Sequence, residues 1–155
     1  MEDKSTVSIT GVAELDASPM FLMGLAYKQF RAELGSLPGG KHSISLEMFG
    51  ALRVLSQHGQ ISQQQLADYL LRNRSVAKRL VDNGIKLELI EASKSLENKK
   101  TKLLSLTPLG EQVVANCAPL VAAGKDHFLT QLSDDEQQQL SRLMQKLVRS
   151  DVLVD

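Results

Sequence analysis

The side chains best placed by type and spacing to do chemistry are cations gathered in the middle of the chain. Residues 72–102 hold nine Lys or Arg and four Asp or Glu, although each kind numbers 18 over the 155 residues. Arg74, Lys78 and Arg79 recur there at the spacing of helical turns, beside the hydroxyl of Ser75. Such groups bind phosphates and the O6 and N7 acceptors of guanine. The cluster fits a nucleic-acid-binding element, although charge alone fits a solvated face equally well.

Two short helices are predicted to hold these cations in place. Ser62 and Gln65 make the capping box S-x-x-Q at the start of a helix of about nine residues. Asn73 is placed to cap a second helix over residues 74–86. Apolar side chains of this second helix face inward, away from the cations: Val76, Leu80 and Val81.

A basic hairpin is predicted after these helices. Residues 89–92 (LIEA) and 101–106 (TKLLSL) read as two strands around the loop SKSLENKK. The loop adds three ammonium groups for neighbouring DNA backbone or the minor groove: Lys94, Lys99 and Lys100. With a short apolar piece around Ile61, the order helix, strand, helix, helix, hairpin indicates a winged helix-turn-helix. In that motif one helix enters a major groove about 12 Å wide while the preceding helix braces it.

Further helices are expected on both sides of this module. One begins at Ser18 and Pro19 and runs to about Leu34, after which the Gly, Pro and Ser of residues 35–43 predict a loop. Three more helices are expected to begin at capping residues: Ser45, Thr107 and Ser133. Pro119 should kink the second of these. The last is expected to bury its apolar residues: Leu140, Leu143, Met144, Leu147 and Val148.

Residues 44–111 resemble the multiple antibiotic resistance regulator (MarR) family of bacterial transcription factors. The matching motifs follow one another without a gap: ISLEMFGALRVL, ISQQQLADYL, RSVAKRLVD, LIEAS and TKLLSLTPLGE. The family's R-S-T-V-T-R-L-V-D helix is similar to residues 74–82, with Ser75 and Arg79 retained and Lys78 in place of a smaller polar residue. The family's L-T-P-x-G is matched by Leu106, Thr107, Pro108 and Gly110.

The resemblance implies an all-α fold with a small β wing, in which a winged helix-turn-helix is flanked by N- and C-terminal dimerisation helices. The implied parts are a flexible N-terminal arm (1–17), a dimerisation helix and loop (18–43), the DNA-binding module (44–106) and C-terminal dimerisation helices (107–155). DNA contacts are expected from the reader helix (Arg74, Ser75, Lys78, Arg79), from the wing (Lys94, Asn98, Lys99, Lys100) and, to phosphate, from the supporting helix (Ser62, Gln63, Gln64).

Two departures from the family pattern affect the DNA-binding elements. The family's wing usually carries D-x-R where this chain has Asn98, Lys99 and Lys100, which predicts weaker or less selective binding because Asn cannot hold a cation as an ion pair. Glu88 replaces a glycine that normally ends the reader helix, and Gly84 stands where the family prefers Leu. Since a mid-helix Gly costs up to about 1 kcal/mol, the reader helix is predicted to end early or flex near Gly84.

Other chemistry finds little support in the sequence. None of the three histidines has the spacing of a metal ligand pair, and no nucleophile motif such as G-x-S-x-G is present, so neither a metal site, a cofactor nor an enzyme is predicted. Cys117 falls on the apolar stripe of its helix. Some members of the family sense oxidants through a cysteine, but a buried structural role is favoured by roughly four to one.

The sequence also supports expectations about an effector pocket and about the location of the protein in the cell. A pocket for a small aromatic effector, of the kind that family members bind, has as candidates Tyr27, Phe30, Met48, Phe49 and Tyr69, although core packing is favoured for most of these side chains. An acidic start unlike a signal peptide, a single cysteine and no apolar run near the roughly 18 residues of a membrane span predict a cytoplasmic protein with no membrane partner.

The sequence thus predicts a transcriptional regulator, a ligand-responsive repressor that binds a pseudo-palindromic operator in double-stranded DNA as a homodimer, although the same geometry also permits activation. One alternative is a winged helix that docks a partner protein and binds DNA weakly or not at all. A second is a thiol-based redox switch at Cys117.

Overall fold

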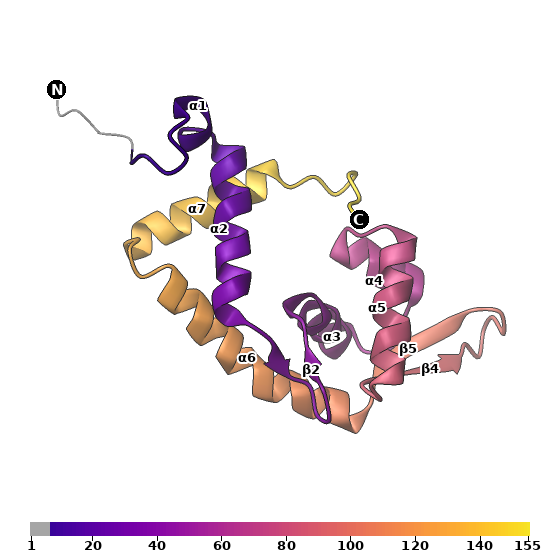
Figure 1. Cartoon of the computed structure of the whole chain (residues 1–155). Helices are drawn as coiled ribbons and strands as arrows, with labels where there is room; N and C mark the ends of the chain where they lie inside the picture. The colour runs from indigo at the N-terminus through magenta and orange to yellow at the C-terminus, as the bar shows by residue number, and fades with distance from the viewer. Residues whose placement is uncertain (1–6) are drawn as a thin grey trace. The chain divides into compact units, whose positions relative to one another are not determined.

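The structure, a computed structural model, describes residues 7–155, in which two compact units are distinguished (Figure 1). The first ends at Gly35 and the second spans Ser36–Asp155. In the first, α2 (Pro19–Leu34) begins as predicted, because the Ser18 hydroxyl accepts a hydrogen bond from the Phe21 N–H at 3.4 Å. Pro19 occupies the first turn, where its missing N–H leaves no helical hydrogen bond unmade.

The part of the predicted flexible arm that the structure describes forms a closed turn; residues 1–6 lie outside the described residues. A short helix, α1 (Ala13–Asp16), ends at the carboxylate that closes it. Asp16 accepts hydrogen bonds from the Thr10 hydroxyl at 2.7 Å and from the N–H groups of Thr10 and Ile9 at 2.8 and 3.1 Å. The hydroxyl of Thr10 is the main cause that lowers the pKa of Asp16. Sequence reasoning missed this turn because its hydrogen bonds span six or seven residues.

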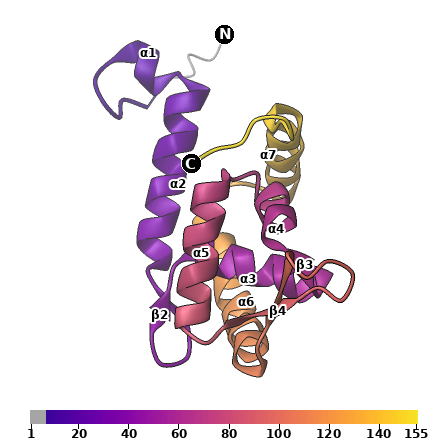
Figure 2. The same cartoon turned by 90° about the vertical axis from the view of Figure 1, so that its right-hand side faces the viewer.

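The second unit contains the predicted winged helix-turn-helix (Figure 2). Its elements are α3 (Leu46–His58), β3 (Ile61–Ser62), α4 (Gln63–Leu70), α5 (Arg74–Lys86), β4 (Ile90–Lys94) and β5 (Lys102–Leu106). The strands form an antiparallel sheet in the order β3-β5-β4, with Leu104 opposite Ile61 and Leu106 opposite Ile90. The all-α fold class with a small β wing is therefore confirmed, and β3 joins the hairpin as a third strand.

The core of this unit fixes the orientation of α5. Ala77 and Val81 of α5 are 0 % and 2 % exposed. They belong to a core supplied by several elements, whose other buried members include Met48, Leu52, Leu55, Leu66, Leu89, Leu104 and Val113. Because burying one such side chain is worth about 1.5–3 kcal/mol, rotating α5 about its axis would be costly. The face of α5 opposite this core is thereby held toward solvent.

Residues 35–43, expected to be a loop, contain a small hairpin. β1 (Leu37–Pro38) pairs with β2 (Ser43–Ile44) in an antiparallel ladder, and the Gly39 N–H donates to the His42 carbonyl at 2.9 Å. The Gly and Pro content indicated the turn correctly, but Leu37 and Ile44 are 2 % and 4 % exposed. Burial of these two flanking side chains explains why short strands form where a loop was predicted.

Two helices complete the second unit. α6 (Pro108–Phe128) is capped by Thr107, whose hydroxyl accepts from the Gly110 N–H at 3.0 Å, and it continues through Pro119 as one helix. α7 (Asp134–Leu147) begins with the predicted capping box between Ser133 and Glu136, with hydrogen bonds of 3.0 and 3.2 Å. The prediction that α7 buries its apolar residues is wrong for the single chain, because most of them are exposed: Leu140, Leu143, Leu147 and Val148.

Candidate nucleic-acid interface

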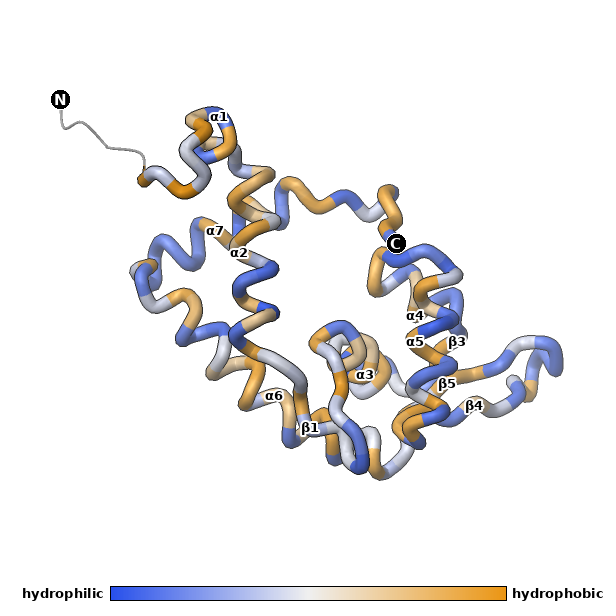
Figure 3. Tube along the Cα trace, in the orientation of Figure 1, coloured by the Kyte–Doolittle hydropathy of each residue, from blue (hydrophilic) through white to orange (hydrophobic). Residues whose placement is uncertain are grey.

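The cations predicted for the reader helix share the solvent face of α5. The opposite side of the helix is buried, whereas all four predicted reader residues are exposed: Arg74, Ser75, Lys78 and Arg79. The hydropathy of the chain shows the same division, with hydrophilic positions recurring along α5 and at the end of the β4–β5 hairpin (Figure 3). Packing of α5 on the core therefore leaves three cations exposed to solvent along this helix.

The three cations differ in their partners. Lys78 Nζ lies 2.6 Å from Asp82 Oδ2, an ion pair one helical turn apart. Within residues 7–155, neither Arg74 nor Arg79 forms a hydrogen bond or an ion pair. Their guanidinium groups, each with five N–H donors, are available to a phosphate or to a guanine edge, while the Lys78 ammonium group already directs one of its three donors to a carboxylate.

A surface hollow of about 300 Å³ lies where α4 and α5 begin. Its walls are Gln63, Gln64, Ala67 and Arg74, so it brings two predicted phosphate contacts beside the first reader residue. The Gln64 amide donates to Asp68 at 2.8 Å. Ser62, the third predicted phosphate contact, has a structural role as well, because its hydroxyl accepts from the Gln65 N–H at 3.1 Å and caps α4.

The C-terminal end of α5 corrects the expectation about Gly84. The helix reaches Lys86, and Gly84 is buried inside it, where a Cβ atom would overlap the side chain of Ile90 on β4. Gly84 thus permits close packing of the reader helix on the wing. The turn that follows places Glu88 at φ 61°, the left-handed conformation that normally favours glycine. The Leu89 N–H donates to the Gly84 carbonyl at 2.9 Å and closes this turn.

The wing carries its cations on a strand end and on a loop. Lys94 is the last residue of β4 and pairs with Lys102 on β5, so two like charges stand opposite each other. Sequence reasoning missed Lys102 because only the strand register shows it to be a neighbour of Lys94. Lys99 and Lys100 are exposed in the loop. Asn98, a predicted DNA contact, uses its side-chain oxygen to accept from the Lys100 N–H at 3.1 Å, which organises the loop.

The turn between α4 and α5 is tied to its surroundings by side chains. The Arg72 guanidinium forms an ion pair with Glu47 at the start of α3. Asn73 stands at the N-cap position of α5, but the prediction that its side chain caps the helix is wrong, because no such hydrogen bond forms. Its amide group donates instead to the carboxylate of Asp155.

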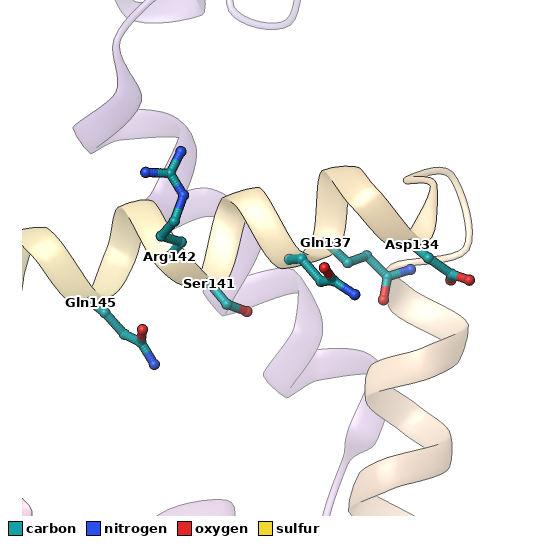
Figure 4. A pocket seen from close by; sticks show the side chains of 6 residues that line it. Asp134, Gln137, Ser141, Arg142 and Gln145 are labelled. Carbon is teal, nitrogen blue, oxygen red and sulfur yellow. The ribbon is translucent and has the colours of Figure 1, made fainter.

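The residues considered for an effector pocket divide between core and surface. Met48 and Phe49 of α3 are 1 % and 8 % exposed and belong to the core of the second unit. The ring of Tyr69 stacks on His58 with ring centres 4.0 Å apart. Tyr27 and Phe30 belong to α2 in the other unit. A hollow of about 460 Å³ on α7 is polar and lined by a single helix, through Asp134, Gln137, Gln138, Ser141, Arg142 and Gln145 (Figure 4).

Cys117 has the environment of a structural cysteine. Its side chain is fully buried, its Sγ donates to the Pro38 carbonyl at 3.1 Å, and burial raises the pKa of the thiol. The thiolate is the form of cysteine that attacks oxidants, so this environment disfavours the redox-switch alternative. Within residues 7–155, no helix is long and apolar enough to cross a membrane.

The curated proteins that resemble this chain in sequence are transcriptional regulators. No family model matches the chain. It is 27 % identical over 126 residues to a protein of Thauera aromatica described as a transcriptional regulatory protein for the hcr operon, covering 81 % of this chain and 74 % of that protein. It is 28 % identical over 107 residues to the HTH-type transcriptional regulator BilQ of Clostridium symbiosum, covering 69 % and 74 %.

Solved structures extend the likeness to the fold. A protein of Pseudomonas aeruginosa described as a transcriptional regulator superposes with a TM-score of 0.79 at 24 % identity, over 86 % of this chain and 99 % of that one. BpsR of Bordetella bronchiseptica superposes with a TM-score of 0.78 at 19 % identity, over 88 % of this chain and 95 % of that one. A mutant MarR from E. coli, solved with operator DNA, superposes with a TM-score of 0.75 at 20 % identity, over 83 % of this chain and 91 % of that one. The chain therefore has the winged-helix fold of the MarR regulators, and its relatives in sequence are transcriptional regulators rather than enzymes.

Proposed function

We propose that the protein is a sequence-specific regulator of transcription that binds double-stranded DNA through α5. The observation that carries this proposal is the pair of guanidinium groups of Arg74 and Arg79, which have no partner in the described part of the chain. They lie on the solvent face of a helix whose other face is buried in the core. In a major groove, arginines on such a face read guanine or hold phosphates. The fold shared with an operator-bound MarR mutant supports the same geometry.

The remaining basic and polar residues have supporting roles in this proposal. Gln63 and Gln64, beside Arg74 in the hollow where α4 and α5 begin, are assigned to the phosphate backbone. Lys99 and Lys100 at the end of the wing, with the opposed pair Lys94 and Lys102, are assigned to phosphates flanking the groove that α5 enters. These contacts add affinity that depends on salt and little on sequence.

Charge removal tests the proposal against the alternative of a protein-binding winged helix. Duplexes selected from a random pool by the wild type would be titrated with the Arg74→Ala, Arg79→Ala double variant, with Arg142→Ala as the control because Arg142 is exposed on α7. We expect the double variant to lose the selected sequence and Arg142→Ala to keep it. A wild type that selects no sequence and binds no duplex at low salt would favour the protein-partner alternative.

The proposed regulator acts as a two-fold homodimer in the cytoplasm. Leu140, Leu143 and Leu147 of α7 follow one another at helical spacing and are 37 %, 50 % and 61 % exposed, an apolar stripe that a second copy could cover. Two α5 helices would then enter major grooves about 34 Å apart, on an approximately palindromic operator. Leu143→Glu should yield monomers in sedimentation equilibrium, whereas Gln138→Glu on the same helix should not.

Repression controlled by a small aromatic acid is the finer part of the proposal. The similar protein BpsR has its DNA binding regulated by 6-hydroxynicotinic acid. A ligand can act in this way only if its affinity differs between the free and the DNA-bound protein. Operator affinity would be measured against a panel of aromatic acids. At least one should weaken it, and a panel that leaves it unchanged would remove this part of the proposal.

A further inference from the structure

The residues that follow α7 are bound to the helix-turn-helix itself. The Val154 N–H donates to the Leu71 carbonyl at 2.9 Å, and the Asn73 N–H donates to the Val154 carbonyl at 2.9 Å. These two bonds make a parallel bridge between Arg72 and Val154. In Figure 1 this last stretch of chain, in yellow, runs from α7 to the turn between α4 and α5. We call residues 149–155 the docked segment.

The way α4 ends leaves two backbone groups of the turn outside the hydrogen bonds of the helices. Leu71 adopts the left-handed conformation, with φ 52°, and the N–H groups of Leu71 and Arg72 donate back to the carbonyls of Asp68 and Ala67. In the described part of the chain, the hydrogen bonds of the Leu71 carbonyl and the Asn73 N–H go to Val154 and to neither helix. These two groups form the short edge to which Val154 binds, in the manner of an added β-strand.

Docking brings a negative charge to the start of the reader helix. The carboxylate of Asp155 accepts a hydrogen bond from the amide of Asn73, the residue directly before Arg74. The N-terminal end of a helix carries a partial positive charge and favours anions, so a carboxylate is stable there. In the proposed complex this same end of α5, with Arg74, meets the DNA backbone. Asp155 and a DNA phosphate would therefore compete for one region of positive potential.

The docked segment lies at the surface and is not part of the core. Val152, Leu153 and Val154 are 45 %, 42 % and 49 % exposed, so none of the three is buried in the core. Its other charges form a pair within the segment, because Arg149 and Asp151 are joined by hydrogen bonds of 3.1 and 2.6 Å. Asp155 is thus the one side-chain charge of the segment that faces the helix-turn-helix without a cation of its own.

We infer that the docked segment is an autoinhibitory strand, which lowers DNA affinity until DNA displaces it. This inference rests on the proposed function, since it assumes that α5 binds DNA. Val154→Pro removes the N–H that donates to Leu71, and Asp155→Asn removes the charge while keeping an acceptor for Asn73. Asp151→Asn removes an equal charge from the same segment without touching the turn, and it serves as the matched control.

Binding of a selected duplex tests the inference. Val154→Pro and Asp155→Asn should each bind about fivefold tighter than the wild type at low salt, Asp151→Asn should bind as the wild type does, and the gain from Asp155→Asn should shrink as salt screens the charge. Equal or weaker binding by both variants would overturn the inference and leave the proposed function standing. If neither the wild type nor the variants bind any duplex, both fail together.

Hydrogen exchange tests whether DNA displaces the docked segment, separately from whether the protein binds DNA. The Val154 and Asn73 amides should be protected in the free protein, and the Asn73 amide should exchange faster in Val154→Pro whether or not DNA is bound. With saturating duplex, the Val154 amide should lose protection because the segment has left. Greater protection of Val154 on the duplex would mean that the segment supports DNA binding, contrary to the inference.

Discussion

The reader helix and the wing carry similar charges on very different supports. Arg74 and Arg79 project from α5, whose residues Ala77 and Val81 are buried in the core, so their backbone positions are fixed before any ligand arrives. Lys99 and Lys100 belong to a loop held mainly by its own hydrogen bonds, such as that from the Lys100 N–H to Asn98. Ordering the backbone of a loop on binding costs about 1–2 kcal/mol for each residue that is fixed, whereas the backbone of α5 is already fixed. The comparison suggests that α5 supplies specificity and the wing supplies charge.

Equal removal of charge from the two regions should have unequal effects. The Arg74→Ala, Arg79→Ala double variant is expected to lose about 100-fold or more in affinity for a selected duplex, because an arginine that reads a base contributes roughly 1–3 kcal/mol and the loss of a phosphate contact adds to this. The Lys99→Ala, Lys100→Ala double variant should lose only about fivefold, and equally on random duplex. Anisotropy titrations on both duplexes measure this, and equal losses from the two variants would break the comparison.

The joint between the two regions is Gly84, where α5 meets Ile90 of the wing. Gly84→Ala should lower the free energy of unfolding by about 1–3 kcal/mol, since the added methyl group overlaps a buried side chain. Gly50→Ala is the control, because a Cβ at Gly50 in α3 meets nothing within 4 Å, and this change should be neutral or stabilise by up to about 1 kcal/mol. Urea unfolding distinguishes them, and an unchanged midpoint for Gly84→Ala would contradict the packing described.

Within α5, the ion pair of Lys78 with Asp82 is expected to restrain DNA binding. Asp82→Asn frees the ammonium group and removes a negative charge from the interface, so affinity should rise by about two- to threefold at low salt and return to the wild-type value at high salt. Asp68→Asn on α4 provides a comparison of the same charge change, because Asp68 contacts Gln64 rather than a cation. A fall in affinity for Asp82→Asn would mean that its carboxylate positions Lys78.

The smallest effect is expected where α5 ends. Glu88 sits at φ 61°, a conformation that costs a side chain with a Cβ atom about 1 kcal/mol or more, part of which glycine recovers. Glu88→Gly should therefore raise the free energy of unfolding by about 0.5 kcal/mol, while its exposed ion pair with Lys41 contributes little. The urea midpoint measures the change, and a clear decrease would show that Glu88 has a stabilising contact of larger size.

Local patterns in the sequence predicted most of the fold, and long-range pairing explains what they missed. Hydroxyl caps such as Ser62 and Thr107 placed helix starts correctly, because a cap involves residues only three apart. The prediction that α5 ends early or flexes at Gly84 was wrong because the role of this glycine depends on Ile90, which packs against it from β4. Asn73 was expected to cap α5, but its partner, Asp155, lies 82 residues away. Lys102 joins the wing cations only through the strand register.

The central claim is that α5 presents cations to DNA, and the salt dependence of binding tests it most directly. Affinity for a selected duplex would be measured by anisotropy at several salt concentrations, with random duplex as competitor. We predict that log affinity falls steeply with log salt, by about 0.9 for each phosphate neutralised, and that the Arg74→Ala, Arg79→Ala double variant has a smaller slope and no preference for the selected sequence. A slope and a preference unchanged in that variant would contradict the claim.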